Sequence, residues 1–165
     1  MKIKNLLLMS FLCCIILLCM TGCFKNIKRK SNNIKDIKKL SFSYSTGNYI
    51  YGSVSYDISF ENGKYILTIK LDNVAPEDAV ELEINNTIIE NVLAILNKYQ
   101  VKEWNGFNKS DQNVLDGNSF NMTITEKDET HISAHGYMKW PENYREVKQE
   151  LDELFKNILD ENKEN

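Results

Sequence analysis

The stretch Ser53–Leu71, SVSYDISFENGKYILTIKL, decides the fold. Its first half alternates apolar residues with serine and aspartate, which is the two-residue period of a half-buried strand. Asn62-Gly63 follows directly and is a strong signal for a two-residue hairpin turn. The apolar positions of the two halves are Val54, Tyr56, Ile58 and Phe60, then Tyr65, Leu67, Ile69 and Leu71. The stretch therefore predicts a β-hairpin with one buried face.

Strand signals continue on both sides of the hairpin. Upstream, Phe42 and Tyr44 alternate with serines before the turn-like Thr46-Gly47-Asn48, which predicts a third antiparallel strand. Downstream, Val80, Leu82 and Ile84 alternate in the same way. We expect a short extended piece there, although Glu77–Glu83 also fits a helical turn.

Two amphipathic helices follow from the 3.6-residue period. The first should start near Asn85 or Asn86, with Thr87 and Glu90 spaced as a capping box. Its apolar stripe is Ile88, Ile89, Val92, Leu93, Leu96 and Tyr99. The second should hold Pro141 in its first turn, where a missing N–H costs nothing. Its stripe is Tyr144, Val147, Leu151, Leu154, Phe155 and Ile158, and the polar tail after Leu159 should fray.

Between the helices the pattern predicts a second hairpin. Val101–Trp104 reads as a brief strand and Asn105–Gly117 as loop. Two strands follow, joined by a turn at Lys127-Asp128-Glu129; their inward residues should be Phe120, Met122 and Ile124, then Ile132, Ala134 and Met138. The fold class is therefore α+β: a single antiparallel sheet (strand meander, helix, hairpin, helix) with two helices on one face.

The N-terminus has the features of an export signal. Lys2 and Lys4 precede an apolar run, Leu6–Met20, that is too short to span a bilayer comfortably. The following Met20-Thr21-Gly22-Cys23 resembles the lipobox of bacterial lipoproteins, with methionine where leucine is usual. The resemblance implies a signal peptide over residues 1–22, a diacylglycerol on Cys23, and a chain anchored at the extracytoplasmic face of the cell membrane. The alternative is an ordinary signal peptide or an uncleaved anchor in which Cys23 is incidental.

Charge divides the rest of the chain. Residues 24–39 hold seven cations and one acid, whereas residues 40–165 hold 11 cations and 22 acids. We interpret residues 23–39 as the lipidated cysteine with a basic linker, which either rests on anionic headgroups or is simply solvated. Residues 40–165 would then form the α+β domain. Its acidity argues against nucleic acid as a partner. The other cysteines, Cys13, Cys14 and Cys19, lie in the signal peptide, so we expect no disulfide.

Catalytic and metal signals are weak. His131 and His135 lie four residues apart on a predicted strand, about 13 Å, which is too far for one ion, so we expect both to be exposed. Asp111–Gly117 resembles a calcium loop, but Asp116 occupies the sixth position, which requires glycine. No catalytic residues, metal or other cofactor are predicted.

Two aromatic-rich segments are the candidate ligand or partner loops. Trp104 and Phe107 follow the first helix, and Tyr137 and Trp140 precede the second. Exposed, these rings would suit stacking on sugars or anchoring a protein partner. Alternatively, they close the core beneath the loops, as large aromatic residues usually do.

The same segments resemble an uncharacterised domain of small bacterial lipoproteins and secreted proteins. The resemblance covers roughly residues 86–155 and rests on the following residues: Tyr99, Val101, Trp104, Gly106, Phe107, Leu115-Asp116-Gly117, Ser119-Phe120, Ala134, Gly136, Pro141 and Tyr144. It implies a structural role for Trp104, Gly106 and Gly136, and it implies no activity or ligand.

These observations lead to two main hypotheses. The first is a non-enzymatic, membrane-anchored binding or accessory module that recognises an envelope protein or a wall or environmental ligand. The alternative is a surface hydrolase using a carboxylate pair, which would need a cleft holding two acids. A self-protection or inhibitor lipoprotein is a third possibility that the sequence neither supports nor opposes.

Overall fold

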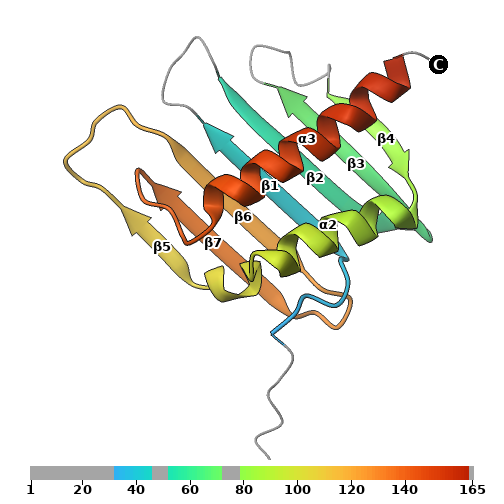
Figure 1. Ribbon diagram of the computed structural model, residues 1–165, viewed down its shortest axis with the longest axis horizontal. Coiled ribbons are helices and arrows are strands. Elements are labelled where there is room, and N and C mark those ends of the chain that lie inside the picture. The colour runs from blue at the N-terminus through green and yellow to red at the C-terminus, as the bar shows by residue number, and fades with distance from the viewer. Residues whose placement is uncertain (1–31, 46–51, 72–78, 164–165) are drawn as a thin grey trace, which may run out of the picture. The chain divides into compact units, whose positions relative to one another are not determined.

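The chain folds as an α+β unit with one seven-stranded sheet and two α-helices (Figure 1). The computed structural model describes residues 32–45, 52–71 and 79–163. In chain order the elements are β1 (Lys39–Ser45), β2 (Ser53–Glu61), β3 (Lys64–Leu71), β4 (Val80–Ile84), α2 (Asn86–Lys98), the 3₁₀ helix η2 (Val101–Trp104), β5 (Phe107–Ser110), β6 (Ser119–Thr125), β7 (His131–Tyr137) and α3 (Tyr144–Lys163). The predicted α+β class, with one sheet and two helices, is confirmed.

The sheet is mixed rather than purely antiparallel. Its strand order is β4-β3-β2-β1-β6-β7-β5. Every neighbouring pair is antiparallel except β5 and β7, which run parallel. The predicted all-antiparallel sheet is therefore wrong at this edge, because β5 lies in a segment expected to be loop.

The predicted hairpin is present between β2 and β3. Glu61 pairs with Lys64, which leaves Asn62 and Gly63 as the two turn residues. Both have positive φ, 53° and 82°, as the favoured two-residue turn requires. Leu71 departs from the prediction: it is 48 % exposed and does not join the core.

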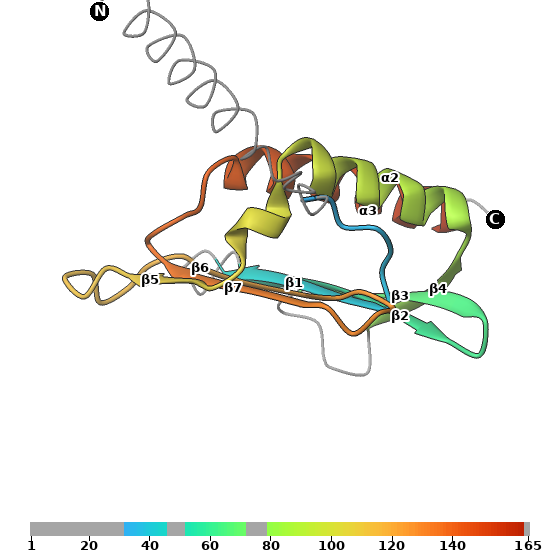
Figure 2. The same cartoon turned by 90° about the horizontal axis from the view of Figure 1, so that it is seen from below.

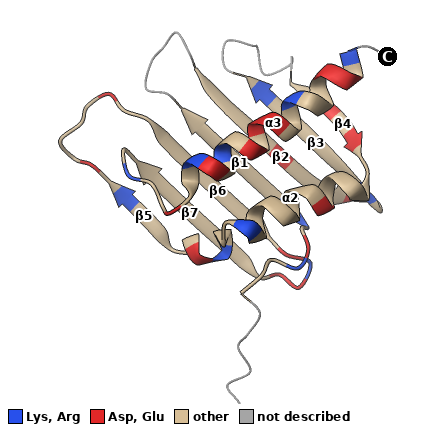
Figure 3. Ribbon diagram, in the orientation of Figure 1, with Lys and Arg blue, Asp and Glu red and all other residues tan. Residues whose placement is uncertain are grey.

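Alternate residues of the strands are buried on the side that holds the helices. Figure 2 shows α2 and α3 lying along the same side of the sheet. Leu40 and Phe42 of β1 are fully buried, as are Val92 and Leu96 of α2 and Leu151 and Phe155 of α3. The charged residues lie mainly on the helices, the loops and the outer strands, and the middle strands are almost uncharged (Figure 3).

The folded unit begins before β1, within the segment expected to be linker. Ile34 is 2 % exposed and Ile37 is fully buried, and both belong to the hydrophobic core. The Asn97 side chain of α2 accepts a hydrogen bond from the Ile34 N–H (2.7 Å) and donates one to the Ile34 carbonyl (2.9 Å). The compact unit therefore starts at Asn32, not at the predicted boundary between residues 39 and 40.

A buried carboxylate fixes the same segment. Glu126, after β6, is 2 % exposed and accepts hydrogen bonds from the Lys35 N–H (2.8 Å) and from Lys102 Nζ (2.7 Å). Lys102 Nζ also donates to the Asn33 carbonyl at 3.1 Å. A carboxylate removed from water is costly unless it is paired and hydrogen-bonded, and Glu126 meets both conditions.

Several local predictions need correction. The N-cap of α2 is Asn85, whose side chain accepts the Ile88 N–H at 3.1 Å, so the predicted Thr87–Glu90 capping box is wrong. Val101–Trp104 forms a 3₁₀ helix instead of a strand. The predicted Thr46-Gly47-Asn48 turn lies outside the described residues.

The start of α3 also differs from the prediction. The helix begins at Tyr144, three residues after Pro141, so Pro141 lies in the connection and not in the first turn. Met138 is 36 % exposed and follows the end of β7, so its predicted inward position is wrong. Gly136 takes the last buried position of that strand. At the other end, α3 is helical as far as Lys163, whereas fraying was predicted after Leu159.

Candidate functional site

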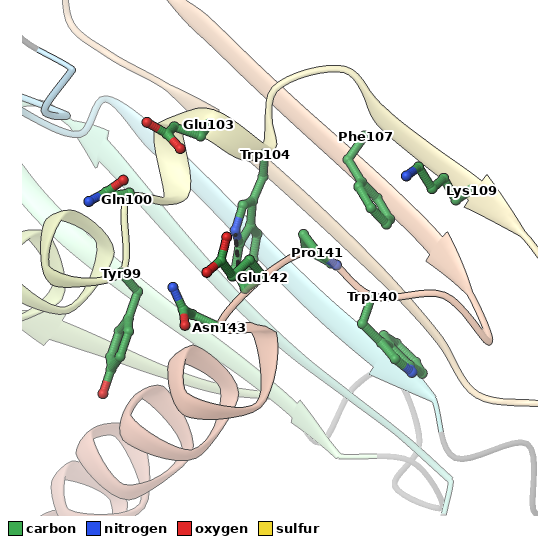
Figure 4. Close-up of a pocket in the computed structure, with 10 residues that line it drawn as sticks. All are labelled: Tyr99, Gln100, Glu103, Trp104, Phe107, Lys109, Trp140, Pro141, Glu142 and Asn143. Carbon is green, nitrogen blue, oxygen red and sulfur yellow. Dashed lines mark hydrogen bonds between the residues drawn. The ribbon is translucent and has the colours of Figure 1, made fainter.

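Three of the four predicted aromatic residues meet at one cleft (Figure 4). Trp104 ends η2, Phe107 starts β5, and Trp140 lies in the connection from β7 to α3. The cleft has a volume of about 380 Å³, within the range of roughly 300–1,000 Å³ typical of small-molecule sites. Its complete lining is Tyr99, Gln100, Glu103, Trp104, Phe107, Lys109, Trp140, Pro141, Glu142 and Asn143. We call it the aromatic cleft.

Trp104 forms the fixed inner wall of the aromatic cleft. Its side chain is 4 % exposed, and its indole Nε1 donates to the Glu142 carbonyl at 3.0 Å. The ring also packs at 6.2 Å from the ring centres of Phe120 and Tyr144. Burial of Trp104 agrees with the alternative that this residue closes the core, while one edge of it still reaches the cleft.

Trp140 is the accessible ring of the cleft. It is half-buried and stacks on Tyr144 with ring centres 4.6 Å apart and an angle of 19° between the planes. Tyr144 is itself in the core, so the stack attaches the connection to the first turn of α3. Phe107, also half-buried, lies 6.1 Å from Phe120. The Lys109 ammonium lies 5.3 Å from the Phe107 ring centre.

Tyr137 does not line the cleft. It ends β7, and its hydroxyl donates to the carbonyls of Val114 (3.1 Å) and Leu115 (2.9 Å). Those contacts hold the Asp111–Asn118 connection against the sheet.

Polar groups surround the apolar centre of the cleft. Glu103 and Glu142 are exposed carboxylates, and Glu103 accepts a hydrogen bond from the Asn32 amide at 2.7 Å. The Tyr99 hydroxyl donates to Glu150 Oε1 at 2.6 Å, and Glu150 is not among the cleft residues. Lys98 Nζ donates to the same oxygen at 2.6 Å. The hydrogen bond from Lys98, followed by that from Tyr99, lowers the pKa of the Glu150 carboxyl. This contact joins the end of α2 to α3 beside the cleft.

A second cleft adjoins the first across Trp140. Its volume is about 190 Å³, and it is lined by Tyr44, Ser45, Asn118, Trp140, Tyr144, Arg145 and Lys148. We call it the basic cleft, because it has two cations and no carboxylate among its lining residues. The shared Trp140 makes the two clefts neighbouring parts of one surface.

A hydrogen-bonded cluster supports one side of the basic cleft. Asp152 Oδ1 accepts from the hydroxyls of Tyr44 (2.8 Å) and Tyr56 (2.9 Å), and Asp152 Oδ2 pairs with Lys148 Nζ (2.6 Å). Burial, followed by the electrostatic interaction with the Tyr56 phenol, raises the pKa of Tyr44 far above its usual range. Burial and the Asp152 charge likewise raise the pKa of Tyr56. Both phenols therefore remain donors to the carboxylate.

The other candidates do not converge on a site. His131 and His135 lie on β7; His131 is exposed as predicted, whereas His135 is half-buried and its Nδ1 lies 2.7 Å from Asn121 Oδ1. Asp111 is already used by its own turn, because Oδ1 accepts the Asn113 N–H at 3.1 Å and Oδ2 lies 3.3 Å from Lys139 Nζ. In the described part of the chain, no three histidine, cysteine or acidic residues are grouped to hold a metal ion. Cys23 lies outside the described residues.

Sequence reasoning did not find the polar lining of the aromatic cleft or the basic cleft. Glu142, Asn143, Arg145 and Lys148 were not among the predicted site residues. One signal was available: Arg145 and Lys148 are three residues apart on a predicted helix and share a face.

A comparison with models of known protein families gave no match, and a search of curated proteins gave no similar sequence. The resemblances to bacterial lipoproteins and to their uncharacterised domain therefore stay predictions. Neither of the two described helices combines the length and the apolar composition needed to cross a bilayer.

Proposed function

We propose that this protein is a lipid-anchored, extracytoplasmic binding module whose aromatic cleft takes a saccharide of the wall or environment. The observation behind this proposal is the cleft that brings Trp104, Phe107 and Trp140 together within a polar rim. Ligand sites of this size combine apolar walls with a few placed polar groups. The anchor would be diacylglycerol on Cys23, and the net negative domain makes nucleic acid an unsuitable ligand.

The lining suits both the apolar C–H face and the hydroxyl groups of a sugar ring. The C–H face of a sugar is apolar and suits the ring of Trp140, which is half-buried and held flat by its stack on Tyr144. The hydroxyls of a sugar need donors and acceptors, which Gln100, Asn143 and Lys109 provide along the rim. Because the Trp140 stack exists without ligand, little ordering cost accompanies binding.

Binding is best tested through tryptophan fluorescence. The chain has two tryptophans, and both line the aromatic cleft, so a bound saccharide should change the emission of the full chain extracted in mild detergent. Titration would start with neutral tetra-N-acetylglucosamine. Trp140→Ala should weaken binding roughly 5- to 30-fold, as loss of about 1–2 kcal/mol of aromatic contact implies.

Two controls make the result decisive. Trp140→Phe keeps a ring and should keep most of the affinity, and Tyr137→Phe, outside both clefts, should bind as the wild type does. Thermal unfolding of each variant separates loss of binding from loss of folding. If neither this saccharide nor an acidic one changes the fluorescence, or if Trp140→Ala binds as tightly as Tyr137→Phe, the proposal is wrong.

The anchor needs its own measurement. Intact mass and membrane partitioning of the native protein should be compared with those of a Cys23→Ala variant. The wild type alone should gain the mass of the lipid and sediment with membranes. Equal masses, or equal release of both proteins, would contradict the lipoprotein assignment.

A hydrolase is the second candidate, because two carboxylates, Glu103 and Glu142, line the same cleft. A general acid at neutral pH normally needs a carboxyl removed from water, whereas both of these residues are exposed. We therefore favour binding without cleavage. Release of reducing ends from the saccharide by the wild type, abolished by Glu142→Gln, would reverse this preference.

A further inference from the structure

The basic cleft differs in charge from the domain around it. Residues 40–165 have twice as many acids as cations, yet the basic cleft is lined by Arg145 and Lys148 and by no carboxylate. Asp152, which contacts the lining residues Tyr44 and Lys148, already accepts three hydrogen bonds. An acidic domain thus presents a local positive surface beside Trp140.

Lys148 is held in place for this role. Its ammonium bridges to Asp152 at 2.6 Å and lies 4.0 Å from the centre of the Tyr44 ring. Because Asp152 also accepts hydrogen bonds from two phenol hydroxyls, its charge is shared among three donors. The ammonium is therefore positioned by its contacts while its side chain keeps 33 % exposure towards solvent.

Arg145 supplies the second charge. It is one of two arginines in the chain, the other being Arg29, and its side chain is exposed. Among the described residues its guanidinium has no acidic partner within salt-bridge distance. A guanidinium presents paired donors that match the two oxygens of a carboxylate or phosphate, and it stays charged at any physiological pH.

Trp140 joins this surface to the aromatic cleft. It lines both clefts, of which the aromatic cleft also contains Phe107 and the basic cleft also contains Arg145 and Lys148. Ser45 and Asn118 add neutral polar groups on the basic side. A substituent on the stacked sugar would therefore meet the cations without leaving the aromatic wall.

We infer that the basic cleft binds a carboxylate or phosphate group of the same ligand, so that the protein selects acidic over neutral saccharides. This inference rests on the proposed function and specifies its ligand class. Arg145 and Lys148 are the residues that set the selectivity, and Trp140 is the residue common to both parts of the ligand.

The test compares three tetrasaccharides by calorimetry with the full chain in mild detergent. The first is neutral tetra-N-acetylglucosamine, the second alternates N-acetylglucosamine with N-acetylmuramic acid and so adds carboxylates, and the third is the neutral chain with one 6-phosphate. At low salt, at least one acidic saccharide should bind about 10-fold more tightly than the neutral one. The ratio should shrink as salt screens the charges.

Variants assign the preference to the cleft. Arg145→Gln should bring the acidic-to-neutral ratio close to one. Lys156→Gln removes a charge from an exposed position of the same helix outside both clefts, and it should leave the ratio at the wild-type value. Lys148→Gln provides a second variant and should reduce the ratio partially, since Arg145 remains.

The outcomes separate this inference from the proposed function. If neutral and acidic saccharides bind equally, or if Arg145→Gln keeps the preference, the inference is overturned and the aromatic cleft can still be a saccharide site. If none of the three saccharides binds, both fail. A preference for the 6-phosphate alone identifies phosphate as the recognised group, and a preference for the muramic form alone identifies carboxylate.

Discussion

Replacing Gly136 by alanine should disturb the cleft region strongly, because the backbone leaves no room for a side chain there. A Cβ built on Gly136 would lie 2.1 Å from the Lys139 carbonyl oxygen and 2.4 Å from Cε1 of Phe120. Real Cβ atoms essentially never approach closer than 3.0 Å, so the carbonyl must move by about 0.9 Å. Phe120 is fully buried and cannot yield freely.

The expected cost follows from that geometry. Overfilling a packed site costs about 1–3 kcal/mol, and an obstacle in the backbone favours the upper half of that range. We therefore expect Gly136→Ala to lower the free energy of unfolding by about 2–3 kcal/mol and the melting temperature by on the order of 10 °C. The displaced Lys139 precedes Trp140, so saccharide affinity should fall as well.

Urea unfolding followed by circular dichroism measures the effect, with Gly117→Ala as the matched control. A Cβ on Gly117 would meet Met138 Cγ at 2.5 Å, Met138 Sδ at 2.8 Å and Tyr137 Cζ at 3.2 Å, but these are side-chain atoms and Met138 is 36 % exposed. Gly117→Ala should therefore cost less than about 1 kcal/mol. If the two variants unfold at the same urea concentration with equal slopes, the close packing around Gly136 does not exclude a side chain there.

Three further predictions concern the support of the fold. Asn97→Ala removes two hydrogen bonds to the Ile34 backbone and should lower the free energy of unfolding, measured in urea, by about 1–3 kcal/mol. Proteolysis at residues 32–38 should accelerate, and an unchanged rate would show that Asn97 does not hold this segment. Glu126→Ala leaves the Lys102 side chain, which is 21 % exposed, without a counter-charge and should lower the free energy of unfolding by about 3 kcal/mol. A decrease below about 1 kcal/mol would show that the ion pair is not needed for stability. The raised pKa values of Tyr44 and Tyr56 stabilise the fold below the ordinary tyrosine pKa of 10.0, and this stability is lost as the pH rises further. Absorbance at 295 nm should therefore show these two phenols ionising only as the protein unfolds, and their ionisation in the folded protein would refute the assignment.

The spacing of apolar residues and the turn residues predicted those parts of the fold in which the local conformational preference agrees with the burial observed in the structure. The β2–β3 hairpin is the clearest case, because strict alternation and Asn62-Gly63 both specify it. The stripes of the two helices were predicted well for the same reason: Ile89 and Val92 are buried in α2, and Val147 and Phe155 in α3.

The failures have identifiable physical causes. β5 is four residues long, Phe-Asn-Lys-Ser, and has no period to detect; it forms because its backbone pairs with β7. Ile34 and Ile37 were hidden among lysines, although their spacing of three is that of residues sharing one side of a turn. The capping prediction failed because Asn85, two residues before Thr87, already satisfies the helix start.

The candidate site was predicted in its aromatic part only. Trp104, Phe107 and Trp140 are conspicuous in sequence, and the structure places them around one cleft. Their polar neighbours could not be selected from sequence, because residues such as Gln100 and Asn143 are common in loops. What distinguishes them is position: each has positive φ, 53° and 59°, at the start of η2 and α3 respectively.

The place where the chain enters the fold has a mechanical consequence. The segment from Asn32 leads directly into β1, which is the fourth of seven strands and is bonded along its whole length to β2 on one side and β6 on the other. A pull on the chain before Asn32 therefore loads first the hydrogen bonds at Ile34 and Lys35 and then the central strand, whose extraction requires both ladders to break. An edge strand under the same pull would be held by one ladder only. A force applied to the chain before residue 32 is thus borne by a strand that is hydrogen-bonded on both sides.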